Sequence, residues 1–79
     1  MELKILRIRA GLSQAEAGKL VGVSQANVSG WEQGDYKPSP AVRARLAEAY
    51  GVSLAEIVRA VEQDAAARED SGGDAAAEE

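Results

Sequence analysis

Residues 13–34 read SQAEAGKLVGVSQANVSGWEQG, and this stretch decides the fold. Ser13 precedes an apolar-periodic segment that ends at Gly22, and Ser24 precedes another that ends at Gly34. Serine caps the free N–H groups of a first helical turn, and glycine adopts the left-handed conformation just past a helix end. The pattern predicts helices over 14–21 and 25–33. Only Gly22, Val23 and Ser24 separate them, so the two helices must cross sharply.

Serine, proline and glycine mark helix starts and ends on both sides of this stretch as well. Gly11 closes a segment over 2–10, Ser39 and Pro40 open one over 40–50 that Gly51 closes, and Ser53 opens one over 54–66. Proline suits a first turn because its missing N–H would have no helical partner there. Ser13-x-x-Glu16 and Ser53-x-x-Glu56 also match the capping box. No alternating β pattern competes, so the sequence predicts an all-α domain of five helices.

Apolar residues recur at helical spacing and predict the core. The expected core positions are Leu3, Leu6 and Ala10, widened by Ile5 and Ile8; Ala17, Leu20 and Val21; Val28 and Trp31; Val42, Leu46, Ala49 and Tyr50; and Leu54, Ile57, Val58 and Val61. Gly18 lies inside a helix, where glycine costs about 0.5–1 kcal/mol relative to alanine. Either the third helix approaches the second closely at this point, or the glycine is merely tolerated.

The composition excludes several classes of function. The chain has 79 residues with no cysteine and no histidine, which leaves no disulfide, no thiolate metal site and no Ser–His–Asp or Cys–His catalytic arrangement. No carboxylate cluster points to other catalysis, so the sequence predicts a protein that is not an enzyme and needs neither cofactor nor metal. No apolar run approaches the roughly 18–20 residues of a membrane span. We therefore expect a cytoplasmic protein without a membrane partner.

The net charge of −4 is unevenly divided. Residues 1–61 hold eight basic and six acidic residues, a balance of +2, whereas residues 62–79 hold one basic and seven acidic residues, a balance of −6. Overall acidity therefore does not argue against a nucleic-acid partner. Past Val61 no large apolar side chain remains, and such a segment cannot offset its ordering entropy. The sequence predicts a domain over 1–62 and an acidic, alanine-rich, mostly disordered tail over 63–79.

A resemblance to a known family covers about residues 3–58. The chain resembles the XRE family, the lambda-repressor-like helix-turn-helix domains of phage and bacterial regulators, at Leu12–Glu16, Val21–Gln25, Val28–Gly34, Lys37–Ser39 and Leu46–Leu54. The resemblance implies a five-helix domain that binds duplex DNA, with its third helix in the major groove. The short glycine-led connection between the second and third helices is typical of such units.

In this geometry the first residues of the third helix face base edges. The candidate base-reading residues are Gln25, Ala26, Asn27 and Ser29. Glutamine can bond adenine through N6 and N7, and alanine offers only apolar contact. Asn27 suits either a base or a phosphate, and Gln25 and Ser29 have the plain alternative of being solvated. Val28 and Trp31 lie on the opposite face and are expected in the core.

Phosphate contacts are expected beside the third helix. The resemblance implies that Gln14, at the start of the second helix, clasps the backbone, and that Gln33 and Lys37 hold it on the other side. Ser24, Arg9 and Arg43 complete the candidate set. For each cation the alternative is an ordinary solvated surface charge.

The resemblance also implies a buried ion pair between Arg7 and Glu32, which would link the first helix to the third. Three positions depart from the family pattern. Gly30 stands where a long polar side chain is common, Asp35 where a basic residue is frequent, and Ala17 where a larger aliphatic residue is usual. These departures predict modest DNA affinity for a single domain, which makes dimerisation more necessary.

The sequence thus predicts a sequence-specific transcriptional regulator. We expect a repressor that binds an inverted-repeat operator as a homodimer and is associated with the nucleoid when bound to DNA. Val61, with exposed parts of Ile57 or Leu54, is the expected dimer surface, unless Val61 only completes the core. The alternative is a protein-interaction module or antitoxin-type regulator whose acidic tail binds a partner protein.

Overall fold

The computed structural model describes residues 1–77, and side chains as far as Arg68. Within that range it contains five helices and no strand. They are α1 (Glu2–Arg9), α2 (Gln14–Val21), α3 (Gln25–Gln33), α4 (Pro40–Tyr50) and α5 (Leu54–Ala77). The predicted all-α class is confirmed, and the first four helices begin and end within one residue of their predicted bounds.

Serine caps start the middle three helices. The hydroxyls of Ser13, Ser24 and Ser39 each accept a hydrogen bond from the backbone N–H three residues later, at 3.0, 3.3 and 3.4 Å. Glu16 closes a capping box at α2 by accepting the backbone N–H of Ser13 at 2.8 Å. This hydrogen bond, aided by the serine hydroxyl, lowers the pKa of Glu16. The local sequence therefore sets where each of these helices begins.

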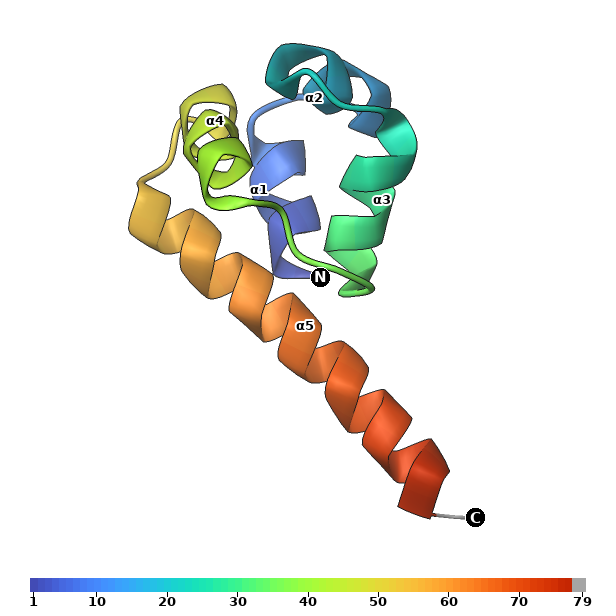
Figure 1. Cartoon of the computed structure of the whole chain (residues 1–79). Helices are drawn as coiled ribbons and strands as arrows, with labels where there is room; N and C mark the ends of the chain where they lie inside the picture. The colour runs from blue at the N-terminus through green and yellow to red at the C-terminus, as the bar shows by residue number, and fades with distance from the viewer. Residues whose placement is uncertain (78–79) are drawn as a thin grey trace.

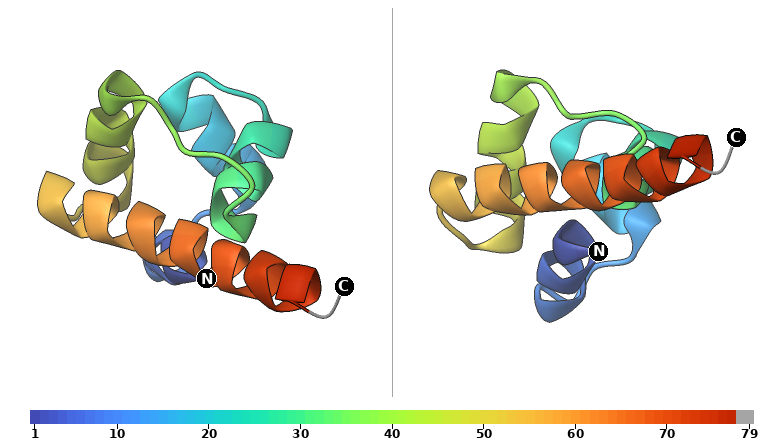
Figure 2. Two further views of the ribbon diagram at one scale, coloured as in Figure 1. Left: turned by 60° about the horizontal axis from the view of Figure 1, so that its bottom comes forward. Right: turned by 90° about the horizontal axis from the view of Figure 1, so that it is seen from below.

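The core lies where α5 crosses the other helices. α5 runs along one side of the molecule and packs against α4 at its start and against α1 and α3 further along (Figures 1 and 2). The largest fully buried side chains are Leu3, Leu46, Ile57, Val21 and Val28. Trp31, Tyr50 and Val61 are also buried there. Each helix thus contributes at least one side chain to a shared core.

Four of the predicted core positions are wrong. Leu20 is 61% exposed, and Ile5, Ile8 and Leu54 are also exposed. In α2 the buried residues are Ala17, Gly18 and Val21, which form a narrower stripe than the apolar pattern allows. α1 likewise buries only Leu3 and Arg7. The helices are short and each meets its neighbours along one edge, so apolar residues beside that edge remain in contact with solvent.

Gly18 lies at the point where α2 meets the turn that leads to α3. A Cβ atom at this position would lie 2.7 Å from the backbone oxygen of Val23 and 3.4 Å from the backbone nitrogen of Gln25. Real Cβ atoms essentially never show a distance as short as 2.7 Å, so a side chain at this position would force the backbone to shift. The expected close approach is confirmed, and it accounts for a glycine inside a helix.

α5 begins at the predicted residue but continues past the predicted end at 66, to Ala77. Asp64 is buried, and its carboxylate accepts the backbone N–H groups of Glu2 at 2.6 Å and Leu3 at 3.1 Å. Ala65 is buried as well, and Arg68 pairs with Asp35 at 3.3 Å. Asp64, Ala65 and Arg68, which composition places in the tail, therefore pack against or pair with the helices before them. The rest of the predicted tail, residues 69–79, lies outside the residues whose side chains are described.

Among the described residues, no helix has the length and apolar character required to cross a membrane.

Candidate nucleic-acid interface

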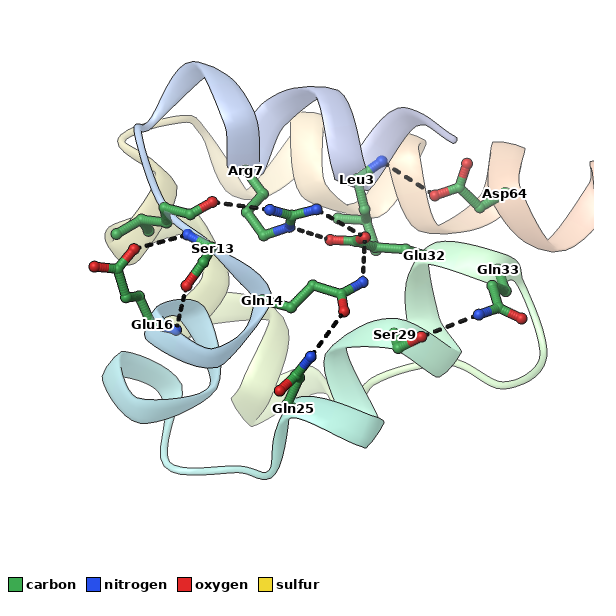
Figure 3. A network of polar contacts seen from close by, with 11 residues as sticks. Leu3, Arg7, Ser13, Gln14, Glu16, Gln25, Ser29, Glu32, Gln33 and Asp64 are labelled. Carbon is green, nitrogen blue, oxygen red and sulfur yellow. Dashed lines mark hydrogen bonds and ion pairs between the residues drawn. The ribbon is translucent and has the colours of Figure 1, made fainter.

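A buried ion pair connects α1 to α3. The Nε atom of Arg7 donates to Glu32 at 2.6 Å and its Nη2 atom donates to the other carboxylate oxygen at 3.3 Å, while Nη1 donates to the backbone oxygen of Leu12 at 2.8 Å (Figure 3). Glu32 is only 3% exposed. The hydrogen bonds to Glu32 raise the pKa of Arg7, so the guanidinium stays charged. The contact expected between Arg7 and Glu32 is therefore present in the structure.

Two glutamines extend this pair to the surface. The Nε2 atom of Gln14 donates to Glu32 at 3.0 Å, and the Nε2 atom of Gln25 donates to the Oε1 atom of Gln14 at 3.4 Å (Figure 3). Gln14 is the first residue of α2 and Gln25 the first of α3. The sharp turn between the two helices brings these two residues together although they are eleven positions apart in the chain.

The direction of this hydrogen-bond chain is fixed by the buried charge. An ionised carboxylate only accepts hydrogen bonds, so Gln14 must turn its Nε2 atom toward Glu32 and its Oε1 atom away. Gln25 then donates to that oxygen, which leaves its own Oε1 atom without a partner among the described residues. Gln25 is exposed. Its amide therefore presents an acceptor and one remaining N–H to solvent, the pair of groups that complements N6 and N7 of adenine.

The other predicted base-reading residues lie along the same helix. Ala26 is exposed, while Asn27 and Ser29 are half-buried. The Nε2 atom of Gln33 donates to the hydroxyl of Ser29 at 3.0 Å, which joins a predicted base-reading residue to a predicted phosphate contact (Figure 3). Ser24 is exposed and caps α3. The structure thus gathers most of the polar candidates around α3.

The three predicted cations are not gathered there. Lys37 pairs with Glu62 of α5, with Nζ 3.0 Å from the nearer carboxylate oxygen. The Nε atom of Arg43 donates to the backbone oxygen of Pro38 at 3.1 Å. Arg9 lines an open groove of about 370 Å³ between α1 and α5. Phosphate contact by these side chains stays a prediction, and the contact of Lys37 requires its ion pair to open.

Tyr36 also belongs to this surface, although the sequence does not indicate it as a candidate. Its hydroxyl donates to the Oδ1 atom of Asn27 at 3.2 Å and lies 3.4 Å from the backbone oxygen of Ala26. The feature of the sequence that could have pointed to Tyr36 is Gly30, because the resembling family usually has a long polar side chain at that position. From the sequence, Gly30 is interpreted only as the loss of a possible DNA contact. In the structure, the absence of a side chain at Gly30 makes room for the ring of Tyr36.

The expected dimer surface on α5 is mostly buried. Ile57 and Val61 belong to the core, so the alternative role of Val61 in completing the core is the one that the structure shows. Of the three residues named for this surface, only Leu54 is exposed. Ile5 and Ile8, on α1, are the exposed isoleucines of the described part of the chain.

Two comparisons with known proteins agree with this geometry. A family described as a helix-turn-helix domain matches residues 1–60. A protein of Bacillus subtilis (strain 168), named "Uncharacterized HTH-type transcriptional regulator YgzD", is 34% identical over 56 residues, which are 71% of this chain and 85% of that protein. No solved structure matches the chain.

Proposed function

Because the chain belongs to the helix-turn-helix domain family, we propose that it is a DNA-binding transcriptional regulator that inserts α3 into the major groove. The finer proposal is a repressor that binds an inverted-repeat operator as a homodimer. The observation that carries the proposal is the hydrogen-bond chain from Arg7 through Glu32 and Gln14 to Gln25. It holds a solvent-facing amide at the start of α3, where such domains contact base edges.

Gln25 is the principal base-reading residue of the proposal. Its free Oε1 atom accepts from adenine N6 while its second N–H donates to N7. The contact with Gln14 orients the amide of Gln25 before DNA binds. It therefore reduces the side-chain conformational entropy that Gln25 loses on binding. Gln14 in turn lies at the N-terminus of α2, whose dipole favours a phosphate. One glutamine thus positions the protein on the backbone and supports the one that reads the base.

Charge assists the encounter in a limited way. Residues 1–61 carry a balance of +2, which favours the approach to phosphates, but Glu62 already occupies Lys37. An exposed ion pair of this kind is worth about 0–1 kcal/mol, so DNA can replace the glutamate at small cost. Asp35 adds negative charge to the same loop, although it pairs with Arg68. Because these acidic residues offset part of the positive charge, we expect each domain to bind DNA with moderate affinity. This expectation supports the proposal that two copies bind together.

Selection of bound duplexes from a random DNA pool, at moderate salt and with the full chain, tests the proposal. The expected result is an inverted repeat whose half-sites lie one helical turn, about 34 Å, apart. Gln25→Ala is expected to reduce discrimination at one base pair of each half-site by about 5- to 150-fold. Gln63→Ala is the matched control, because Gln63 is an exposed glutamine on α5 beside α1 and should leave the selected sequence unchanged.

The other outcomes separate the alternatives. A single unrepeated half-site would contradict the homodimer and leave the DNA-binding function in place. A folded protein that enriches no sequence would contradict sequence-specific binding. The interaction module, in which the acidic segment binds a basic partner protein, would then become the better proposal.

A further inference from the structure

The ring of Tyr36 lies directly on the backbone of α3 at Gly30. A Cβ atom at position 30 would lie 2.5 Å from both Cε1 and Cζ of the ring and 2.6 Å from the hydroxyl oxygen. No residue other than glycine fits under the ring in this position. Gly30 is buried although it lies on a helix whose neighbouring residues Ala26 and Gln33 are exposed.

The hydroxyl of Tyr36 reaches the polar groups of the same face. It donates to the Oδ1 atom of Asn27 at 3.2 Å and lies 3.4 Å from the backbone oxygen of Ala26. Positions 26, 27 and 30 are neighbours on a helix, because residues three and four apart share a face. Tyr36, which comes from the loop after α3 and is 47% exposed, therefore lies across the first turns of the helix that carries the proposed base-reading residues.

In this structure the contact with Tyr36 engages the oxygen of the Asn27 amide. The Oδ1 atom accepts from Tyr36, and the Nδ2 atom has no hydrogen-bond partner among the described residues. An amide nitrogen only donates, so Asn27 offers donors to a ligand. On base edges in the major groove, the matching acceptors are O6 and N7 of guanine, N7 of adenine and O4 of thymine, and only guanine offers two of them on one base. Asparagine with both ends free would instead favour adenine, through N6 and N7 together.

We propose that Tyr36 and Asn27 form one base-reading unit, in which the tyrosine hydroxyl holds the amide oxygen and directs the Nδ2 atom to the O6 and N7 acceptors of guanine. The unit reads a base pair different from the one that Gln25 reads. Tyr36 is the positioning residue, and its ring occupies the place of the side chain that Gly30 lacks. The inference rests on the proposed function, since it names a further specificity determinant of the same surface.

Tyr36→Phe tests the unit because it removes only the hydroxyl and keeps the ring on Gly30. Selection from the random pool is first carried out with the unchanged protein and then with Asn27→Ala, which identifies the base pair that Asn27 reads. At that base pair Tyr36→Phe is expected to reduce the preference for G·C over A·T about two- to tenfold, the effect of one hydrogen bond. The preference at the base pair assigned to Gln25 should not change.

Two further variants distinguish positioning from a general structural effect. Tyr50→Phe makes the same chemical change at the other tyrosine, which is buried in the core, and should leave the whole selected sequence unchanged at neutral pH. Gly30→Ala should displace the ring and reproduce the loss caused by Tyr36→Phe. In the Tyr36→Phe background, Gly30→Ala should change the base preference no further, because the hydroxyl that it displaces is already absent.

Each contrary result has a distinct meaning. If the unchanged protein selects a site and both Tyr36→Phe and Gly30→Ala keep the same preferences, the inference is wrong and the proposed function stands. A preference for an A·T pair at the position that Asn27 reads would overturn the assigned direction of the amide. If the unchanged protein selects no site, the proposed function fails first and the inference fails with it.

Discussion

Replacement of Arg7 by methionine is expected to destabilise the domain severely. Methionine keeps an unbranched apolar stem but removes the donors that reach Glu32 at 2.6 and 3.3 Å and the backbone oxygen of Leu12 at 2.8 Å. Glu32 would then stay buried with Gln14 as its one remaining hydrogen-bond partner among the described residues. Breaking a buried pair from one side costs about 3–5 kcal/mol. A chain of this length has a total stability of about 4–12 kcal/mol, so the variant should be partly unfolded at 37 °C.

Urea unfolding measures this loss, followed by circular dichroism and by the fluorescence of Trp31, the single tryptophan of the chain. Arg9→Met is the matched control, because Arg9 is an exposed arginine of the same helix and should change the free energy of unfolding by less than about 0.5 kcal/mol. The double variant Arg7→Met/Glu32→Met should recover most of the loss, since it leaves no unpaired buried charge. A loss below about 1 kcal/mol for Arg7→Met, or a double variant less stable than the single one, would refute the reasoning.

Two further predictions concern Asp64 and Tyr50. Asp64→Ala removes the acceptor for the first N–H groups of α1 and should lower the free energy of unfolding by about 1–2 kcal/mol in urea, whereas the exposed control Glu62→Ala should cost less than about 1 kcal/mol. Equal losses in the two variants would contradict a capping role for Asp64. Burial raises the pKa of Tyr50 to about 12, with the charge of Glu32 adding to the effect. The neutral phenol therefore stabilises the fold fully below pH 10, and this stability is lost as pH rises toward 12, by about 1 kcal/mol at pH 11. Tyr50→Phe should lack this part of the alkaline loss, so an unchanged difference in urea stability between the two proteins at pH 8 and pH 11 would show that burial does not act in this way.

The helices could be predicted closely because their ends depend on neighbours in the chain. Ser13 and Ser24 cap through N–H groups three residues away, and Gly22 ends α2 with a φ of 85°. The buried face of each helix could be predicted less accurately than its ends. Leu20 satisfies the apolar period of α2 and is nevertheless exposed, since the period does not state how wide a stripe the neighbouring helices cover. The role of Asp64 is harder still to predict from the sequence, because its partner Leu3 is 61 positions away in the chain.

The candidate site was predictable where a family pattern supplied long-range information. The resemblance names both Arg7 and Glu32, which are 25 positions apart, and the structure brings them together. It does not supply the contact between Gln14 and Gln25, which follows from the crossing angle at the turn. It also gives no information on Tyr36, since the position of that ring depends on a loop and on a glycine in another element.

Two ion pairs connect α5 to the loop that carries Tyr36, one just before the tyrosine in the sequence and one just after it. Asp35 pairs with Arg68 at 3.3 Å, and Lys37 pairs with Glu62 at 3.0 Å. Each exposed ion pair is weak by itself, but the two fix the residues immediately before and after the tyrosine. The position of the Tyr36 hydroxyl over α3 therefore depends on Glu62 and on Arg68, of which composition places Arg68 in the acidic tail. In this domain the last helix supports the proposed base-reading surface through the loop that joins α3 to α4.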